Sequence, residues 1–152
     1  MRHWAVFVTL ATLTVAMVPA CAAGIDDKIP DQQSIDALEA RAQQAQPREQ
    51  CYLYAELVHQ MTEYSARRYA AGDVDKASEL LKHIQKFAHS IHLSVAEDNK
   101  RLKNAEILLR HTAFRLNEML HASSLEDRPL LEQTLAQVNQ ADTDAMLQVF
   151  RK

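Results

Sequence analysis

The hydrophobic pattern of the chain is dominated by one stretch, from Asp73 to His121, that contains neither glycine nor proline. Apolar residues recur in it at steps of three and four, and the phase of this repeat does not change. A mean period of about 3.5 residues is typical of a helix that packs along a seam against other helices. We therefore expect one long central helix over about 73–121. Its seam positions are Leu81, Ile84, Ala88, Ile91, Val95, Asp98, Leu102, Ala105, Leu109, Thr112, Leu116 and Met119.

The segments on either side of this stretch predict helices that run antiparallel to it. Residues 31–71 carry two helical patterns that meet at Pro47, a residue that starts or kinks a helix because it has no amide hydrogen. Gly72 lies where this region must end, and it suits the left-handed conformation of a helix C-terminus. A last amphipathic pattern covers 128–150. The predicted fold is all-α: an elongated helical bundle in which helices at about 31–71, kinked at Pro47, and 128–150 flank the central helix.

The first 23 residues have the features of a secretory signal peptide. Arg2 supplies a positive charge, residues 4–18 form an apolar run too short to span a membrane, and Ala20-Cys21-Ala22 provides a small-residue cleavage site. We expect a signal peptide at 1–23, a flexible leader at 24–30 and a single helical domain at 31–152. The protein would then be exported, either to a periplasm or into the medium.

The two cysteines leave two alternatives open. Val18 to Cys21 also resembles a bacterial lipobox, although Pro19 departs from that pattern, so a lipid anchor at Cys21 is the alternative to ordinary cleavage. Cys51 shares a helix face with Val58, which predicts a buried thiol. An intermolecular disulfide is the alternative, because an exported protein meets an oxidising compartment.

Composition and charge narrow the classes of function. The chain has 152 residues, 47% of them hydrophobic, and a formal net charge of −3, which offers no electrostatic basis for binding nucleic acid. The sequence contains no glycine-rich phosphate loop, no nucleophile elbow and no paired-cysteine motif. We therefore expect a protein that is not an enzyme, has no cofactor and has no membrane span.

Two Glu-x-x-His motifs, Glu56 to His59 and Glu118 to His121, are of the kind that di-iron proteins carry at the centre of a helical bundle. Both lie outside the apolar seams, and a continuous central helix would hold them far apart, so we do not predict a di-iron site. A looser cluster is favoured by the hairpin register about Gly72. Imidazole and carboxylate ligands suit zinc, copper or nickel, and a periplasmic metal sensor or carrier is the alternative function. The candidate metal ligands are Glu56, His59, His89 and His92.

An apolar surface is the main functional prediction. Around Gly72 only two helices are expected, yet the pattern before it is apolar on two faces, and large exposed apolar patches mark contact surfaces. We expect an exported, non-catalytic interaction or chaperone-like protein that forms a homodimer or binds a helical protein partner. In the alternative, the helix that begins near Asp31 folds over this surface and closes a monomer. The predicted interface residues are Leu53, Leu57, Tyr64, Leu80 and Phe87.

Overall fold

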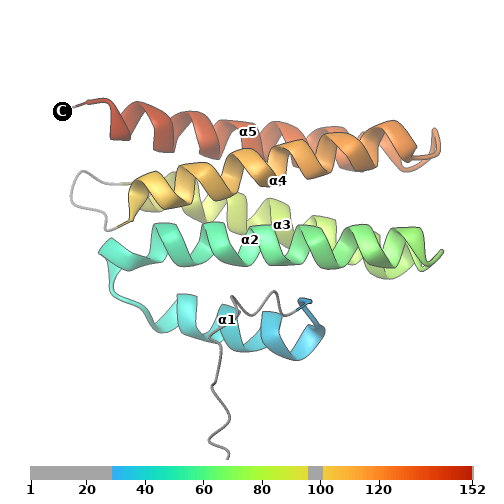
Figure 1. Cartoon of the computed structure of the whole chain (residues 1–152), viewed down its shortest axis with the longest axis horizontal. Coiled ribbons are helices and arrows are strands. Elements are labelled where there is room, and N and C mark those ends of the chain that lie inside the picture. Colours follow the sequence, from blue (N-terminus) through green and yellow to red (C-terminus); the bar gives the residue numbers. More distant parts are fainter. Residues whose placement is uncertain (1–28, 96–100, 152) are drawn as a thin grey trace, which may run out of the picture.

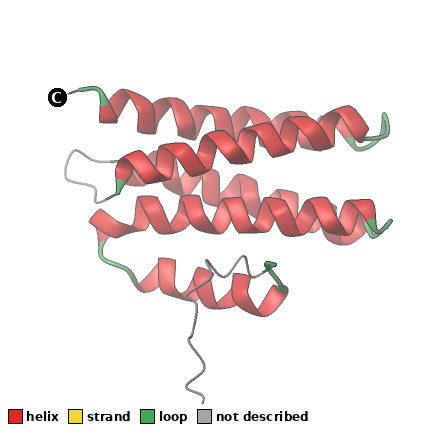
Figure 2. Cartoon of the chain, in the orientation of Figure 1, coloured by secondary structure: helices red, strands yellow, loops and turns green. Residues whose placement is uncertain are grey.

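The computed structural model describes residues 29–95 and 101–151, so the predicted signal peptide and Cys21 lie outside the described residues. The described chain is entirely helical and packs as a helical bundle, which confirms the predicted all-α class (Figures 1 and 2). None of its helices is both long and apolar enough to cross a membrane. The helices are α1 (Gln32–Gln44), α2 (Pro47–Ala70), α3 (Val74–Ser94), α4 (Leu102–Ala122) and α5 (Arg128–Val149).

Helices α2 to α5 form a four-helix bundle in which α2 and α4 run in one direction and α3 and α5 in the other, and α1 packs on the outside of α2 (Figure 1). Helix α2 packs against α3 and α4, and α5 packs against the same two helices. Consequently α2 lies diagonally opposite α5, and α3 lies diagonally opposite α4. The α2–α3 and α4–α5 turns lie at one end of the bundle, and the C-terminus lies at the other.

The prediction of one central helix over 73–121 is wrong. Helix α3 ends at Ser94, and Val95 already has extended backbone. Helix α4 begins after Arg101, which adopts a left-handed conformation with φ of 60°. The chain reverses between these helices, so that α4 lies beside α2 and α5. Asp98, the polar position of the predicted seam, lies outside the described residues.

The prediction of which residues of α3 and α4 lie on the seam is confirmed, whereas the prediction that they belong to one continuous helix is wrong. Because a repeat with a helical period can keep its phase across a reversal, the pattern alone does not reveal the break. Folding back is favoured because a rod would leave apolar faces of α2 in water, and each large apolar side chain contributes about 1.5–3 kcal/mol when it is buried. The seam residues buried in α3 and α4 are Leu81, Ile84, Ala88, Ile91, Leu102, Ala105, Leu109, Thr112, Leu116 and Met119.

Local signals at the other helix ends explain where the chain turns. Ala45 and Gln46 are both extended, so Pro47 starts a separate helix instead of kinking a continuous one. The reason is steric: a proline disfavours helical backbone in the residue before it. Gly72 has a φ of +82°, as expected for the residue that ends α2. Asp31 caps α1 by accepting a hydrogen bond of 2.7 Å from the backbone N–H of Ser34.

Helix α1 covers the surface that was predicted to be an interface. It contributes three buried side chains, and the guanidinium of Arg67 in α2 donates a hydrogen bond to the carbonyl of Pro30 just before α1. The predicted interface residues are therefore buried inside this chain, and α1 packs on α2 as the alternative expects, whereas the monomeric state in that alternative stays a prediction. The buried residues of that predicted interface are Leu53, Leu57, Tyr64, Leu80 and Phe87.

Cys51 is also fully buried, as its helix position predicts. Burial raises the pKa of its thiol to about 11, while a hydrogen bond with Ser94 acts in the opposite direction. The thiolate, which is the form that exchanges with disulfides, is therefore scarce at neutral pH. This environment does not favour the intermolecular disulfide.

If α1 is an integral layer, removing its buried anchor should destabilise the whole chain. Ile35 is 1% exposed, whereas Ile29 just outside the helix is 69% exposed. We expect Ile35→Ala to lower the free energy of unfolding by about 2–5 kcal/mol, because it deletes buried methyl groups and leaves a cavity. Ile29→Ala, the matched control, should change it by less than about 0.5 kcal/mol. Denaturant unfolding of both variants measures this, and equal effects would show that α1 is not packed as described.

Candidate binding groove between α2 and α4

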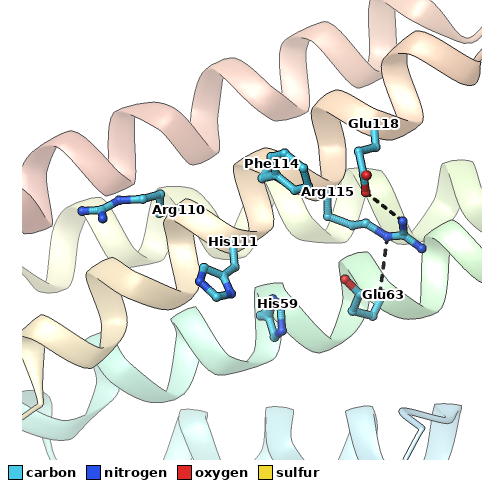
Figure 3. Close-up of a pocket in the computed structure, with 7 residues that line it drawn as sticks. All are labelled: His59, Glu63, Arg110, His111, Phe114, Arg115 and Glu118. Carbon is cyan, nitrogen blue, oxygen red and sulfur yellow. Dashed lines mark hydrogen bonds and ion pairs between the residues drawn. The ribbon is translucent and has the colours of Figure 1, made fainter.

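An open groove with a volume of about 660 Å³ follows the surface where α4 lies beside α2 (Figure 3). Helix α2 contributes two of its lining side chains, and α4 contributes the others. The groove exists only because α4 folds back onto α2. Its lining residues are His59, Glu63, Arg110, His111, Phe114, Arg115 and Glu118.

Phe114 is the main apolar group on this surface, with 66% of the residue exposed. The buried positions of α4 place it on the outward side of the helix, and Ile107, two turns earlier, is also exposed. The exposed ring of Phe114 leaves apolar surface in contact with water, and exposed apolar surface is concentrated at sites of protein contact.

The end of the groove that lies toward the α4–α5 turn carries a net negative charge. The Arg115 Nε lies 3.4 Å from Glu63 Oε2 of α2, and another nitrogen of the same guanidinium lies 2.9 Å from Glu118 Oε2 (Figure 3). The single positive charge of Arg115 is therefore shared between two carboxylates. This ladder of Glu63, Arg115 and Glu118 connects α2 to α4 and holds the charged side chains beside Phe114 in place.

The other end of the groove presents a guanidinium. Arg110 pairs with Glu106 one turn earlier in α4, and the Glu106 carboxylate is buried while the Arg110 side chain is 65% exposed. Asp142 of α5 is a further acidic neighbour. Burial raises the pKa of the Asp142 carboxyl, and the attraction of Arg110 lowers it by a smaller amount.

His59 is partly buried at the contact between the two helices. The hydroxyl of Thr112 donates its proton to the carbonyl of Leu108 at 2.8 Å, so the Thr112 oxygen is left to accept from His59 Nδ1 at 3.3 Å. We therefore assign the Nδ1–H tautomer to neutral His59. Burial lowers the pKa of His59, and nearby His111 acts in the same direction. Glu63 and Glu56 oppose this shift.

The structure does not bring the four predicted metal ligands together. His59 contacts Thr112 across the α2–α4 seam, whereas His92 pairs with Asp144 across the α3–α5 seam on the opposite side of the bundle. His89 stacks on His92, with ring centroids 6.2 Å apart. Across residues 29–95 and 101–151, no three His, Cys, Asp or Glu side chains are grouped so that they could hold a metal ion. The hairpin register about Gly72 is close to the predicted one, because Ser65 bonds to Ala77 and Tyr54 stacks on Phe87. His59 nevertheless contacts Thr112 of α4 instead of joining His92.

The second Glu-x-x-His motif is likewise not turned toward the core. Glu118 pairs with Arg115, and His121 is exposed near the end of α4. The α2–α4 groove does not follow from the predicted central helix, because that helix would hold α4 beyond the end of α2. The sequence signal for this surface is Phe114, a large aromatic residue outside the seam of a strongly patterned helix.

Comparison with known proteins found no matching family model, no matching curated protein and no matching solved structure. The geometry of the groove is thus the basis for any functional argument.

The lowered pKa of His59 predicts an acid-sensitive stability. In the unfolded chain this histidine takes up a proton near its usual pKa of about 6.5, whereas the folded chain resists protonation until a lower pH. The unfolded state therefore binds more protons in this window, and stability falls as the pH drops through it. We expect His59→Gln to reduce the loss of unfolding free energy between about pH 7.5 and pH 5.5, measured by denaturant titration.

His121→Gln is the matched control, because His121 is exposed on the same pair of helices. It should keep the pH dependence of the wild type. If both substitutions reduce the dependence equally, or if neither does, the desolvation of His59 is not its source.

Proposed function

We propose that this chain is an exported, non-catalytic helical interaction protein that binds a protein partner through the groove between α2 and α4. The observation that carries this proposal is the exposure of Phe114 at the centre of a charged groove on a rigid bundle. The export component rests on the signal-like character of residues 1–23.

The groove has the composition expected of a recognition surface. Specific interfaces combine a desolvated aromatic anchor with a polar rim, and aromatic residues and arginine are enriched at their centres. Here Phe114 is the anchor, and Arg110 and Arg115 stand on either side of it. Both arginines already pair with carboxylates of the same chain. Such pairing holds the rim in one geometry, so a partner would meet a surface that is largely preorganised.

The size of the apolar area favours one specific partner over general chaperone-like holding of unfolded chains. Binding unfolded chains requires a broad apolar surface, and the larger apolar set that was predicted for this role is buried inside the chain. On the outward face of α4, the exposed apolar side chains are Phe114 and Ile107. A surface of this kind recognises a partner that offers one apolar insertion and complementary charges.

Site-specific photocrosslinking in the native host tests the proposal. A benzophenone amino acid replaces Phe114 in one variant and Phe150 in the matched control, because Phe150 is an equally large side chain and is 78% exposed on a different surface. We expect discrete covalent adducts from position 114 and none of the same mass from position 150. Identical adducts at both positions, or none at position 114, would contradict the proposal.

The metal-binding alternative calls for a separate measurement. We expect protein purified without an affinity tag to contain no zinc, copper or nickel at molar stoichiometry, because His59 and His92 lie on opposite seams of the bundle. Elemental analysis by mass spectrometry measures this. A stoichiometric metal that is lost in both the His59→Gln and the His92→Gln variants would instead support a carrier or sensor.

A further inference from the structure

We infer that the partner bound by this groove is a second copy of the same chain, which docks antiparallel on α4 about a two-fold axis at Phe114. This inference rests on the proposed function and deepens it by naming the partner. The argument comes from the order of residues along the exposed stripe of α4. That stripe consists of Lys103, Ile107, Arg110, Phe114, Glu118 and His121, all of them exposed.

The charges on this stripe change sign at Phe114. Lys103 and Arg110 lie on the N-terminal side, and Glu118 lies on the C-terminal side. A two-fold interface brings each residue against the one equally far from the axis in the other copy. Arg110, four residues before Phe114, then faces Glu118 of the other copy, four residues after it. The symmetry produces this contact twice, once on each side of the axis.

The apolar groups follow the same symmetry. Phe114 lies on the axis and meets its own counterpart, and paired aromatic rings prefer the offset or edge-on contacts that a two-fold axis permits. Ile107 faces His121 of the other copy, so its side chain is covered by an imidazole ring. The groove beside Phe114 supplies the concave surface that receives the opposing ring.

The ion pairs already present leave both charges available to the second copy. The Arg110 side chain remains 65% exposed above Glu106, and a guanidinium has five N–H donors for several acceptors. Arg115 is shared between Glu63 and Glu118, which leaves one carboxylate in excess at the acidic end. An incoming Arg110 would balance this excess.

The contact is of modest size, because it is centred on one helix and the walls of one groove. Interfaces below about 1,200 Å² of total buried surface are usually reversible. We therefore expect a dimer that dissociates on dilution, with a dissociation constant on the order of 10 µM. Salt should weaken it, because its specificity comes from partly exposed charges.

Charge-reversal variants test whether the partner is a second copy of the chain and whether Arg110 faces Glu118 in the dimer. In sedimentation equilibrium of the protein purified from its native host, Arg110→Glu alone and Glu118→Arg alone should each weaken the dimer about tenfold or more, since each brings like charges together twice. The double variant exchanges the two charges and should return the dissociation constant to within about threefold of the wild type. Glu132→Arg, on the exposed surface of α5, is the control for charge reversal and should have no effect.

The aromatic contact is tested in the same assay with a matched pair. Phe114→Ala should weaken the dimer about tenfold, and Phe150→Ala should leave it unchanged. Both phenylalanines are largely exposed, so thermal unfolding of these variants should stay close to that of the wild type.

Three outcomes would overturn the inference: a wild type that stays monomeric at a concentration of about 200 µM, a double variant no better than the single ones, or equal effects of the two phenylalanine substitutions. These failures differ from a failure of the proposed function. A monomeric protein that still forms a discrete adduct with another protein through position 114 would keep the binding groove and replace its occupant. A monomer without adducts would remove both.

Discussion

Helix α2 has buried side chains on several sides, and the remaining helices are arranged so that this surface stays out of water. Its buried side chains face α3, α4 and α1, so three separate helices are needed to cover one. Helix α3 follows α2 through the Gly72 turn and covers one side. The chain reversal between α3 and α4 brings α4 to a second side, and α1 closes the third. Burial of α2 therefore determines both the four-helix core and the position of the added helix.

Directional polar contacts determine how the helices are aligned once burial has brought them together. The buried hydroxyl of Ser65 in α2 donates to the carbonyl of Ala77 in α3 at 3.1 Å. At the end of the bundle, the Tyr69 hydroxyl donates to Asp127 at 2.7 Å and accepts from the backbone N–H of Ser124 at 3.2 Å. Tyr69 thus ties the end of α2 to the α4–α5 turn. Because an unpaired buried polar group is costly, these contacts penalise any sliding of one helix along another.

Helix positions and core residues follow from local signals in this chain, and so they could be predicted. The seam residues from Leu81 to Met119 are buried as expected, apart from the partly buried Val95 and Asp98, which is not described. Gly72 and Asp31 act at helix ends as their chemistry requires. These features depend on residues a few positions apart. The end of α3 after Ser94 does not depend on nearby residues alone. It is favoured because α4, some fifty residues further along the chain than α2, then covers α2.

The candidate site could not be predicted for the same reason. His59 and Thr112 become neighbours only through the reversal between α3 and α4. The hairpin register about Gly72 predicts which parts of α2 and α3 lie side by side, but it does not reveal that His59 faces α4. Likewise, the apolar face around Leu57 reads as a surface until α1 is placed over it. In both cases, the exposure of a residue on α2 depends on a helix that is distant from it in the sequence.

The reversal that completes the core also creates the surface to which we assign function. In a continuous rod, Phe114 would lie far beyond the end of the α2–α3 hairpin, so α2 could not form a groove with it. In the bundle, α4 is held against α2 by the contact between His59 and Thr112 below and by the ladder of Glu63, Arg115 and Glu118 above. These contacts support the helix that carries Phe114 while leaving the ring itself uncovered. The interactions that stabilise the α2–α4 seam are thus the ones that preorganise its outer face for binding.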